Sequence, residues 1–217
     1  MFYYYFYQVA MILSLLVSGF MFILLWPRRQ LPGVGAMIAL ATATFVCTFG
    51  FYIETHGTTL DRQLLFNNIG YIGSMSIPVA WFIFALNYTS GFKLVKGWRV
   101  ILLCIVPFIT IVLIWSNNWH HLMWSNAHLI TSGSFTVTAK TYGPFFWVAI
   151  TYSYILLIIA AVILVRRLFV GLPLYIGQAI SLILAVIFPT AWSVISIFKL
   201  ITLPRVEITP VMFALSG

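Results

Sequence analysis

Long apolar runs, separated by short polar or basic segments, dominate the pattern of this chain. A helix needs about 20 apolar residues to cross a hydrocarbon core of about 30 Å. Runs of that length predict six full spans, near residues 4–26, 33–53, 65–88, 99–116, 143–167 and 173–198. The pattern therefore predicts an all-α membrane protein that folds as a polytopic helical bundle.

The last segment, EITPVMFALSG (207–217), has the composition of the start of a seventh span. About ten helical residues extend only about 15 Å, which is half of a bilayer. We therefore interpret residues 1–217 as a seven-transmembrane domain that is truncated in its seventh helix, with any output domain absent.

The longest loop, residues 117–143, contains the only predicted β-structure. The passage HLITSGSFTVTAKTYGP (128–144) alternates β-branched and polar residues around Ser132 and Gly133. Alternation interrupted by a Ser-Gly pair is typical of two short strands joined by a turn. We expect a small extracytoplasmic β-hairpin that lies over the mouth of the bundle.

Composition supports the membrane interpretation and excludes a nucleic-acid partner. The chain is 63% hydrophobic and 6% charged, whereas soluble domains carry about 25% charged residues. Lipid must therefore be the main solvent of the folded chain. The net charge of +8 comes from basic residues in short clusters between the spans, as in cytoplasmic loops, and not along one phosphate-binding face.

The distribution of Lys and Arg predicts the orientation. Alternate loops hold seven basic residues, Arg28, Arg29, Lys93, Lys96, Arg99, Arg166 and Arg167, against four on the other side, Arg62, Lys140, Lys199 and Arg205. The richer side faces the cytoplasm. We expect a multi-pass protein of the cell (inner) membrane with an extracytoplasmic N-terminus. All acidic residues and all histidines then lie outside.

The passage SNNWHHLMWSN (116–126) places His120 and His121 between two tryptophans, the second of which is Trp124. We prefer an interfacial cap, with the histidines hydrogen-bonded to loop carbonyls, and assign no metal and no cofactor. A zinc site, formed with His56, His128 and Glu54 or Asp61, stays an alternative, although no His-x-x-x-His or Cys-x-x-Cys spacing supports it. A pH sensor is the third interpretation, because histidine titrates near neutral pH.

The spans themselves carry few ionisable groups, which argues against several classes of function. They hold no chain of acidic residues for proton relay and no lysine for a retinal Schiff base. No nucleophile–base pair or phosphate-binding loop is present, so we expect no enzymatic activity in this chain. We expect in-span amides and hydroxyls, such as Asn67, Asn68 and Ser76, to join helices by hydrogen bonds. Three prolines, Pro78, Pro107 and Pro189, should bend their helices.

Five passages, in order, resemble the seven-helix N-terminal region of bacterial sensor histidine kinases. They are NIGYIGSMSIPVAWFIFALNYTS (68–90), NNWHHLMW (117–124), YGPFFWVAITYSYIL (142–156), YIGQAISLILAVIFP (175–189) and EITPVMFALSG (207–217). At Glu207 the family more often has aspartate. The resemblance implies a sensory input domain, whose seventh helix leads into a PAS domain or directly into an output module.

The resemblance and the outer cluster of polar residues together give a functional hypothesis. A small-molecule or lipid ligand at the outer mouth would favour one packing of the bundle, and the seventh helix would carry that bias to the output. The candidate sensing residues are Glu54, His120, His121, Trp124, Gln178 and Glu207. Expected partners are the bilayer, the ligand and, as in related kinases, a second copy in a homodimer. The alternatives are an accessory membrane subunit of a larger complex and a metalloenzyme that uses the outer histidines.

Overall fold

The computed structural model describes residues 2–31, 33–89, 97–132 and 135–170. Its helices are α1 (Phe2–Leu25), η1 (Trp26–Arg28), α2 (Val34–Glu54), α3 (Leu60–Thr89), α4 (Gly97–Trp115), α5 (Asn117–His120) and α6 (Pro144–Val170), and its strands are β1 (Trp124–Ser132) and β2 (Phe135–Tyr142). Among these residues five helices, α1, α2, α3, α4 and α6, are long and apolar enough to cross a membrane. The protein is therefore a multi-pass membrane protein. The predicted sixth span (173–198) and the start of the seventh (207–217) lie outside the described residues.

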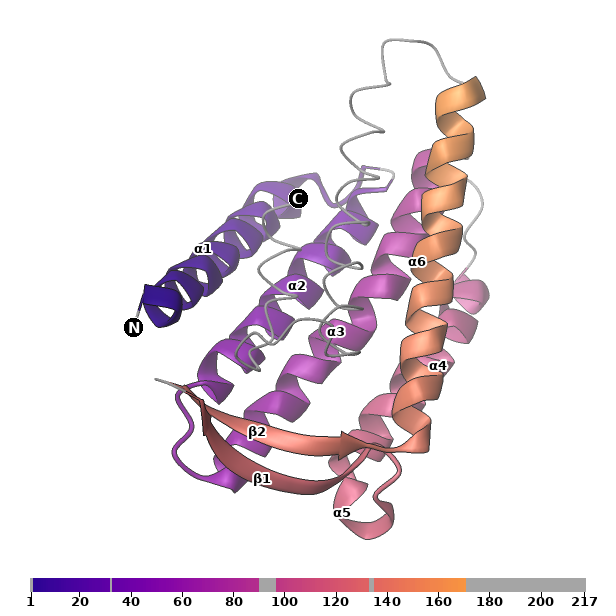
Figure 1. Ribbon diagram of the computed structural model, residues 1–217. Helices are drawn as coiled ribbons and strands as arrows, with labels where there is room; N and C mark the ends of the chain where they lie inside the picture. The colour runs from indigo at the N-terminus through magenta and orange to yellow at the C-terminus, as the bar shows by residue number, and fades with distance from the viewer. Residues whose placement is uncertain (1, 32, 90–96, 133–134, 171–217) are drawn as a thin grey trace.

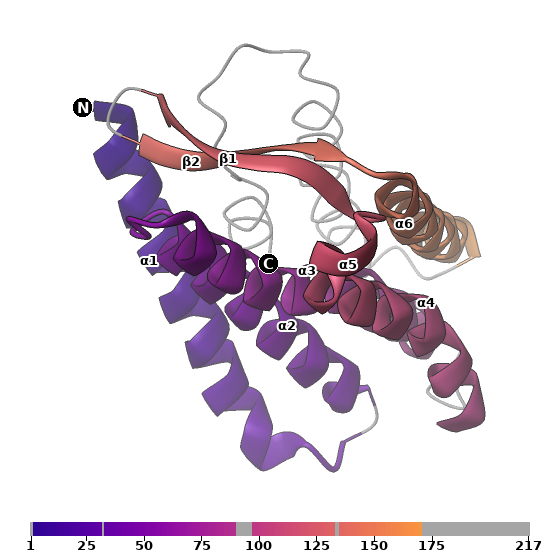
Figure 2. The same ribbon diagram turned by 90° about the horizontal axis from the view of Figure 1, so that it is seen from below.

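Helix α3 is the centre of the described bundle (Figure 1). It packs against α2, α4, α6 and both strands, while α1 packs on the other side of α2. The hairpin lies across one end of the bundle and extends from the α1 side toward α6 (Figure 2). We call this end, where α2 and α4 finish and α3 and α6 begin, the hairpin end. The opposite end holds the α1–α2 connection, the end of α3 and the beginning of α4.

The hairpin confirms the predicted β-structure and corrects its extent. The strands pair in antiparallel register from Trp124↔Tyr142 to Ser132↔Phe135, with an irregularity between Ser125 and His128. Strand β1 thus begins at Trp124, earlier than the alternating passage suggested. Asn126, at φ 52°, interrupts the alternation at the irregularity, which explains why the pattern hid the first residues of the strand.

Helix α3 is also longer than the predicted span of 65–88, because it begins at Leu60. The added turn, LDRQL, is too polar to register in a hydropathy pattern. Its Gln63 is nevertheless completely buried. The turn is therefore stabilised by hydrogen bonds to the rest of the hairpin end and not by contact with lipid.

Small residues bring α2 and α3 into close contact. A Cβ on Gly73 would clash with the carbonyl oxygen of Ala43 and the amide nitrogen of Cys47, and would come within 2.7 Å of the Cys47 Cα. One on Gly50 would clash with the backbone of Gly70. In lipid, where tails are as apolar as side chains, close packing of this kind is a main source of helix association. Glycine at both positions thus sets the α2–α3 distance.

Hydrogen bonds inside the spans follow the prediction only in part. Ser14 Oγ and Thr48 Oγ1 join α1 to α2 at 3.0 Å, and Tyr152 OH donates to Leu103 O across α6 and α4 at 2.7 Å. The Ser76 hydroxyl instead bonds the carbonyl of Ile72 in its own helix. A helical serine can satisfy its hydroxyl four residues back without any neighbour, so an in-span serine does not identify a helix contact.

Replacement of Gly73 by alanine should destabilise the bundle by about 1–3 kcal/mol, since the neighbouring backbone must move to admit a methyl group. Thermal unfolding in lipid nanodiscs measures this effect. Gly35→Ala is the matched control, because a Cβ there meets nothing within 4 Å. Equal melting temperatures for the two variants would show that close α2–α3 packing does not limit stability.

Candidate functional site

One face of α3 carries the polar and aromatic residues of the hairpin end. Gln63, Asn67, Tyr71 and Met75 recur every four residues, so their side chains share one stripe. All four are buried, with exposed fractions between 0% and 6%. Residues of this kind at the end of a span need hydrogen-bond partners, and the hairpin supplies them.

Strand β2 meets this stripe at two positions. Thr138 and Lys140, two residues apart, project from the same face of the strand. The Thr138 hydroxyl donates to Gln63 Oε1 at 2.7 Å, and the Lys140 ammonium donates to Asn67 Oδ1 at 2.8 Å. Gln63 Nε2 donates in turn to the carbonyls of Thr136 (2.8 Å) and Gly57 (2.9 Å). The hairpin is thus fixed to the beginning of α3 at two points.

Asn67 links a cation on the hairpin to an anion on α2. Its Oδ1 accepts from Lys140, while its Nδ2 donates to Glu54 Oε2 at 2.9 Å. An ammonium group can only donate and a carboxylate can only accept, so the two partners fix the orientation of the amide. Glu54 and Lys140 are both half-buried. The amide therefore stabilises two charges that are partly removed from water.

Two aromatic rings complete the surroundings of the Lys140 ammonium. Its Nζ lies 4.5 Å from the ring centroid of Trp124 and 5.2 Å from that of Tyr71. The two rings stack at 5.7 Å with an interplanar angle of 28°. Both distances are within the range of cation–π attraction. We call Asn67, Tyr71 and Trp124 the ammonium cage.

Asn117 holds the backbone on which Trp124 sits. Its Nδ2 donates to Trp124 O at 2.8 Å, and its Oδ1 accepts from Met123 N at 3.0 Å and Trp124 N at 3.3 Å. The residue is 3% exposed. Three bonds to the main chain make Asn117 the residue that positions the start of β1.

His120 and His121 occupy different surroundings. His120 Nδ1 accepts the backbone N–H of Leu122 at 3.0 Å, so the neutral ring carries its proton on Nε2, which lies 3.1 Å from Ser116 Oγ. His121 is exposed and ends α5 with φ 55°. The cap interpretation, in which these histidines bond loop carbonyls, stays a prediction. The bonds of His120 go to an N–H and a hydroxyl, however, and the bonds to loop or helix carbonyls are made by His56 and His128.

The zinc alternative finds no geometric support in the described part of the chain. There, no three side chains of His, Cys, Asp or Glu come together as a metal site would need. Gln178 and Glu207, the last two predicted sensing residues, lie outside that part. Of the predicted residues that it includes, Trp124 contacts Lys140 directly and Glu54 is linked to it through the Asn67 amide, whereas His120 and His121 lie at the connection before β1.

Sequence reasoning missed three residues on which the site depends: Gln63, Asn117 and Lys140. Gln63 and Asn117 belong to polar segments that a hydropathy pattern treats as loop. Lys140 was considered only as one of the basic residues that predict the orientation of the chain in the membrane. One signal was present, because Lys140 and Thr138 alternate on the predicted second strand, which places both on one face.

The sequence of the chain also matches a known protein family. The sequence model of a family described as the N-terminal 7TM region of histidine kinase matches residues 10–217. The chain belongs to this family. A search of curated proteins found no match. The match confirms the resemblance of the five sequence passages and classifies the membrane helices as part of a histidine-kinase 7TM region.

Asn117→Ala should destabilise the start of β1, because it leaves the backbone groups of Met123 and Trp124 without their buried partners. Each such group costs about 1–3 kcal/mol. Hydrogen exchange at residues 122–125 should therefore accelerate. Asn118→Ala, at the exposed neighbouring position, is the control and should leave exchange unchanged. Equal protection in both variants would rule out a positioning role for Asn117.

Proposed function

We propose that the chain is a membrane-embedded sensory input domain that detects a small-molecule or lipid ligand at the hairpin end and controls a histidine-kinase output. The observation that carries the proposal is the double attachment of the hairpin to α3 through Gln63 and Asn67. A ligand that moves the hairpin must break or shift buried hydrogen bonds on the central helix. The kinase output module would come after the seventh helix in the sequence, and two copies of the receptor would signal as a dimer.

The ends of the described helices support an extracytoplasmic hairpin. Arg28, Arg29, Arg99 and Arg166 belong to the opposite end. The hairpin end holds the basic residues Arg62 and Lys140 together with the acidic residues Glu54 and Asp61. By the positive-inside rule the opposite end faces the cytoplasm. The N-terminus and the hairpin then face outward from the cell membrane, where an external ligand can reach them.

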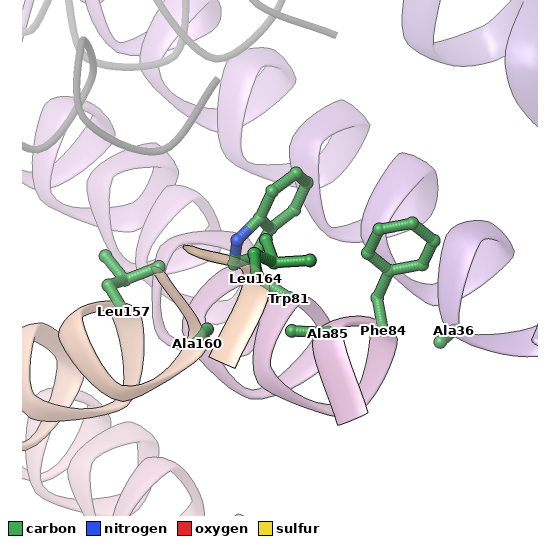
Figure 3. Packing of buried hydrophobic residues seen from close by; sticks show 7 residues of the cluster. All are labelled: Ala36, Trp81, Phe84, Ala85, Leu157, Ala160 and Leu164. Atoms are coloured by element: carbon green, nitrogen blue, oxygen red, sulfur yellow. The ribbon is translucent and has the colours of Figure 1, made fainter. Parts of the chain in front are cut away.

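Helix α3 offers a direct route between the two ends. Pro78 lies inside the helix and cannot donate the hydrogen bond that would join it to the carbonyl of Ser74. Beyond Pro78, α3 packs through Trp81, Phe84 and Ala85 against Leu157, Ala160 and Leu164 of α6, and against Ala36 of α2 (Figure 3). A displacement at Gln63 or Asn67 can therefore change helix packing at the cytoplasmic end.

Ligand control requires different affinities of the ligand for two packings of the bundle, because equal affinity shifts no equilibrium. The two attachments suggest how the packings differ. In one, the hairpin stays bonded to α3 at both points. In the other, at least one attachment is open and α3 is released at its first turns.

Cysteine labelling tests the orientation. In a chain with Cys47→Ala and Cys104→Ala, Asn118→Cys reports the hairpin end and Gln30→Cys the opposite end; both positions are exposed and neither change alters the charge. A membrane-impermeant maleimide applied to intact cells should label Asn118→Cys, and should label Gln30→Cys only after permeabilisation. The reverse pattern would place the N-terminus and the hairpin in the cytoplasm.

Autophosphorylation of the native full-length receptor tests the function. Gln63→Leu keeps the size of the side chain and removes its three hydrogen bonds, so it should alter basal kinase activity severalfold. Arg62→Gln, at the exposed neighbouring position, should not. Unchanged activity in Gln63→Leu, despite faster hydrogen exchange in the hairpin, would contradict coupling through α3. Co-purification with another membrane protein at fixed stoichiometry would then favour the accessory-subunit alternative.

A further inference from the structure

We infer that the ammonium cage is a binding site for an organic ammonium group, and that Lys140 is the built-in competitor that fills it. The external ligand would carry a protonated or quaternary amine. The inference rests on the proposed function for its signalling consequence, because binding alone does not require a kinase output.

The cage offers the three features that recognise an ammonium group. Trp124 and Tyr71 present aromatic rings at 4.5 and 5.2 Å from the positive centre, and cation–π attraction strengthens when the rings are removed from water. Both rings are buried, at 4% and 6% exposure. Asn67 Oδ1 supplies an acceptor at 2.8 Å. The Glu54 carboxylate, bonded to the other side of that amide, adds the compensating charge.

The walls of the cage are held by contacts that do not involve Lys140. Asn117 fixes the backbone of Trp124. Tyr71 packs edge-on against Phe51 of α2, with centroids 6.0 Å apart. Asn67 is bonded to Glu54. The cage should therefore keep its shape when the Lys140 side chain leaves it.

Lys140 itself is suited to leave. It stands on a strand at the edge of the bundle and is only half-buried, whereas the three residues of the cage are buried. A lysine side chain is a strongly hydrated charge on a flexible stem of four carbons. It can exchange the cage for water at the rim without any movement of the backbone. An incoming ammonium group would then take over its cation–π contacts with Tyr71 and Trp124, and a ligand that carries an N–H or O–H donor, such as the hydroxyl of choline, could also donate to Asn67 Oδ1.

This exchange would open one of the two attachments of the hairpin. The bond from Lys140 to Asn67 is lost, while the bonds of Thr138 and Thr136 to Gln63 remain. Competition by a tethered group also weakens apparent affinity, because such a group acts at an effective concentration in the millimolar range. Removal of the Lys140 charge should therefore strengthen binding of an external ammonium ion.

Choline is a suitable probe, and 3,3-dimethyl-1-butanol is its uncharged analogue of the same shape. The purified chain in nanodiscs, labelled with 5-fluorotryptophan, gives separate ¹⁹F NMR signals for its eight tryptophans, and Trp124→Phe identifies the signal of Trp124. In Lys140→Met, choline should shift this signal saturably. The apparent dissociation constant should be about tenfold or more below that of the unsubstituted chain. Arg62→Met, which removes a cation outside the cage, is the control and should bind like the unsubstituted chain.

The inference is overturned if folded Lys140→Met shows no saturable shift at Trp124, or if the uncharged alcohol shifts the signal equally. If Lys140→Met does not fold, the same measurement on the unsubstituted chain tests the inference. Choline chloride should move its Trp124 signal more than sodium chloride of equal ionic strength, and equal effects of the two salts overturn the inference. Choline binding that leaves the kinase activity of the full-length receptor unchanged would contradict the proposed function and not the site. Absence of binding would leave the Gln63→Leu result as an independent test of coupling.

Discussion

The hairpin end depends on one side-chain amide, that of Asn67, which stands between the Lys140 ammonium and the Glu54 carboxylate. The amide joins the consecutive helices α2 and α3 to β2, whose Lys140 lies 73 positions further along the sequence. Its orientation is dictated by chemistry, since only one arrangement gives each charge a suitable partner. A charged pair at a membrane surface loses part of its hydration, and the amide and the two aromatic rings replace that hydration. The position of the hairpin over the bundle follows from this arrangement.

The two attachments of the hairpin to α3 differ in kind. Gln63 is completely buried and exchanges neutral hydrogen bonds with one side chain and two carbonyls, so opening it would leave several groups unpaired. Lys140 ends in a charge that water solvates well, and its half-buried position lets water replace its bond to Asn67 Oδ1. The Gln63 attachment is therefore the costlier of the two to open, and the Lys140 attachment is the one whose partner exchanges more easily with water.

Sequence patterns found those features that depend on local periodicity. Hydrophobic runs located all five spans of the described chain, because the bilayer imposes a minimum apolar length. Alternation located the hairpin. The contacts that build the site were out of reach, since the bond between Lys140 and Asn67 joins residues separated by 73 positions and no local pattern encodes such a pair. The first turn of α3, with its buried Gln63, and the role of Asn117 were hidden for a related reason. Their polar residues resemble loop until a partner elsewhere in the chain is known.

The difference between local patterns and contacts of distant residues also explains why Glu54 and Trp124 were recognised as candidates and Lys140 was not. An acid at the end of a span and a tryptophan at the interface stand out individually, because each is costly or enriched at that depth. A lysine in an outer loop is ordinary and is normally solvated. What distinguishes Lys140 is the ring geometry around it, which exists only after α3 and the hairpin have come together. In this bundle the spans are therefore specified by composition along the chain, whereas contacts such as those of Lys140 arise where polar residues of several elements meet at one end.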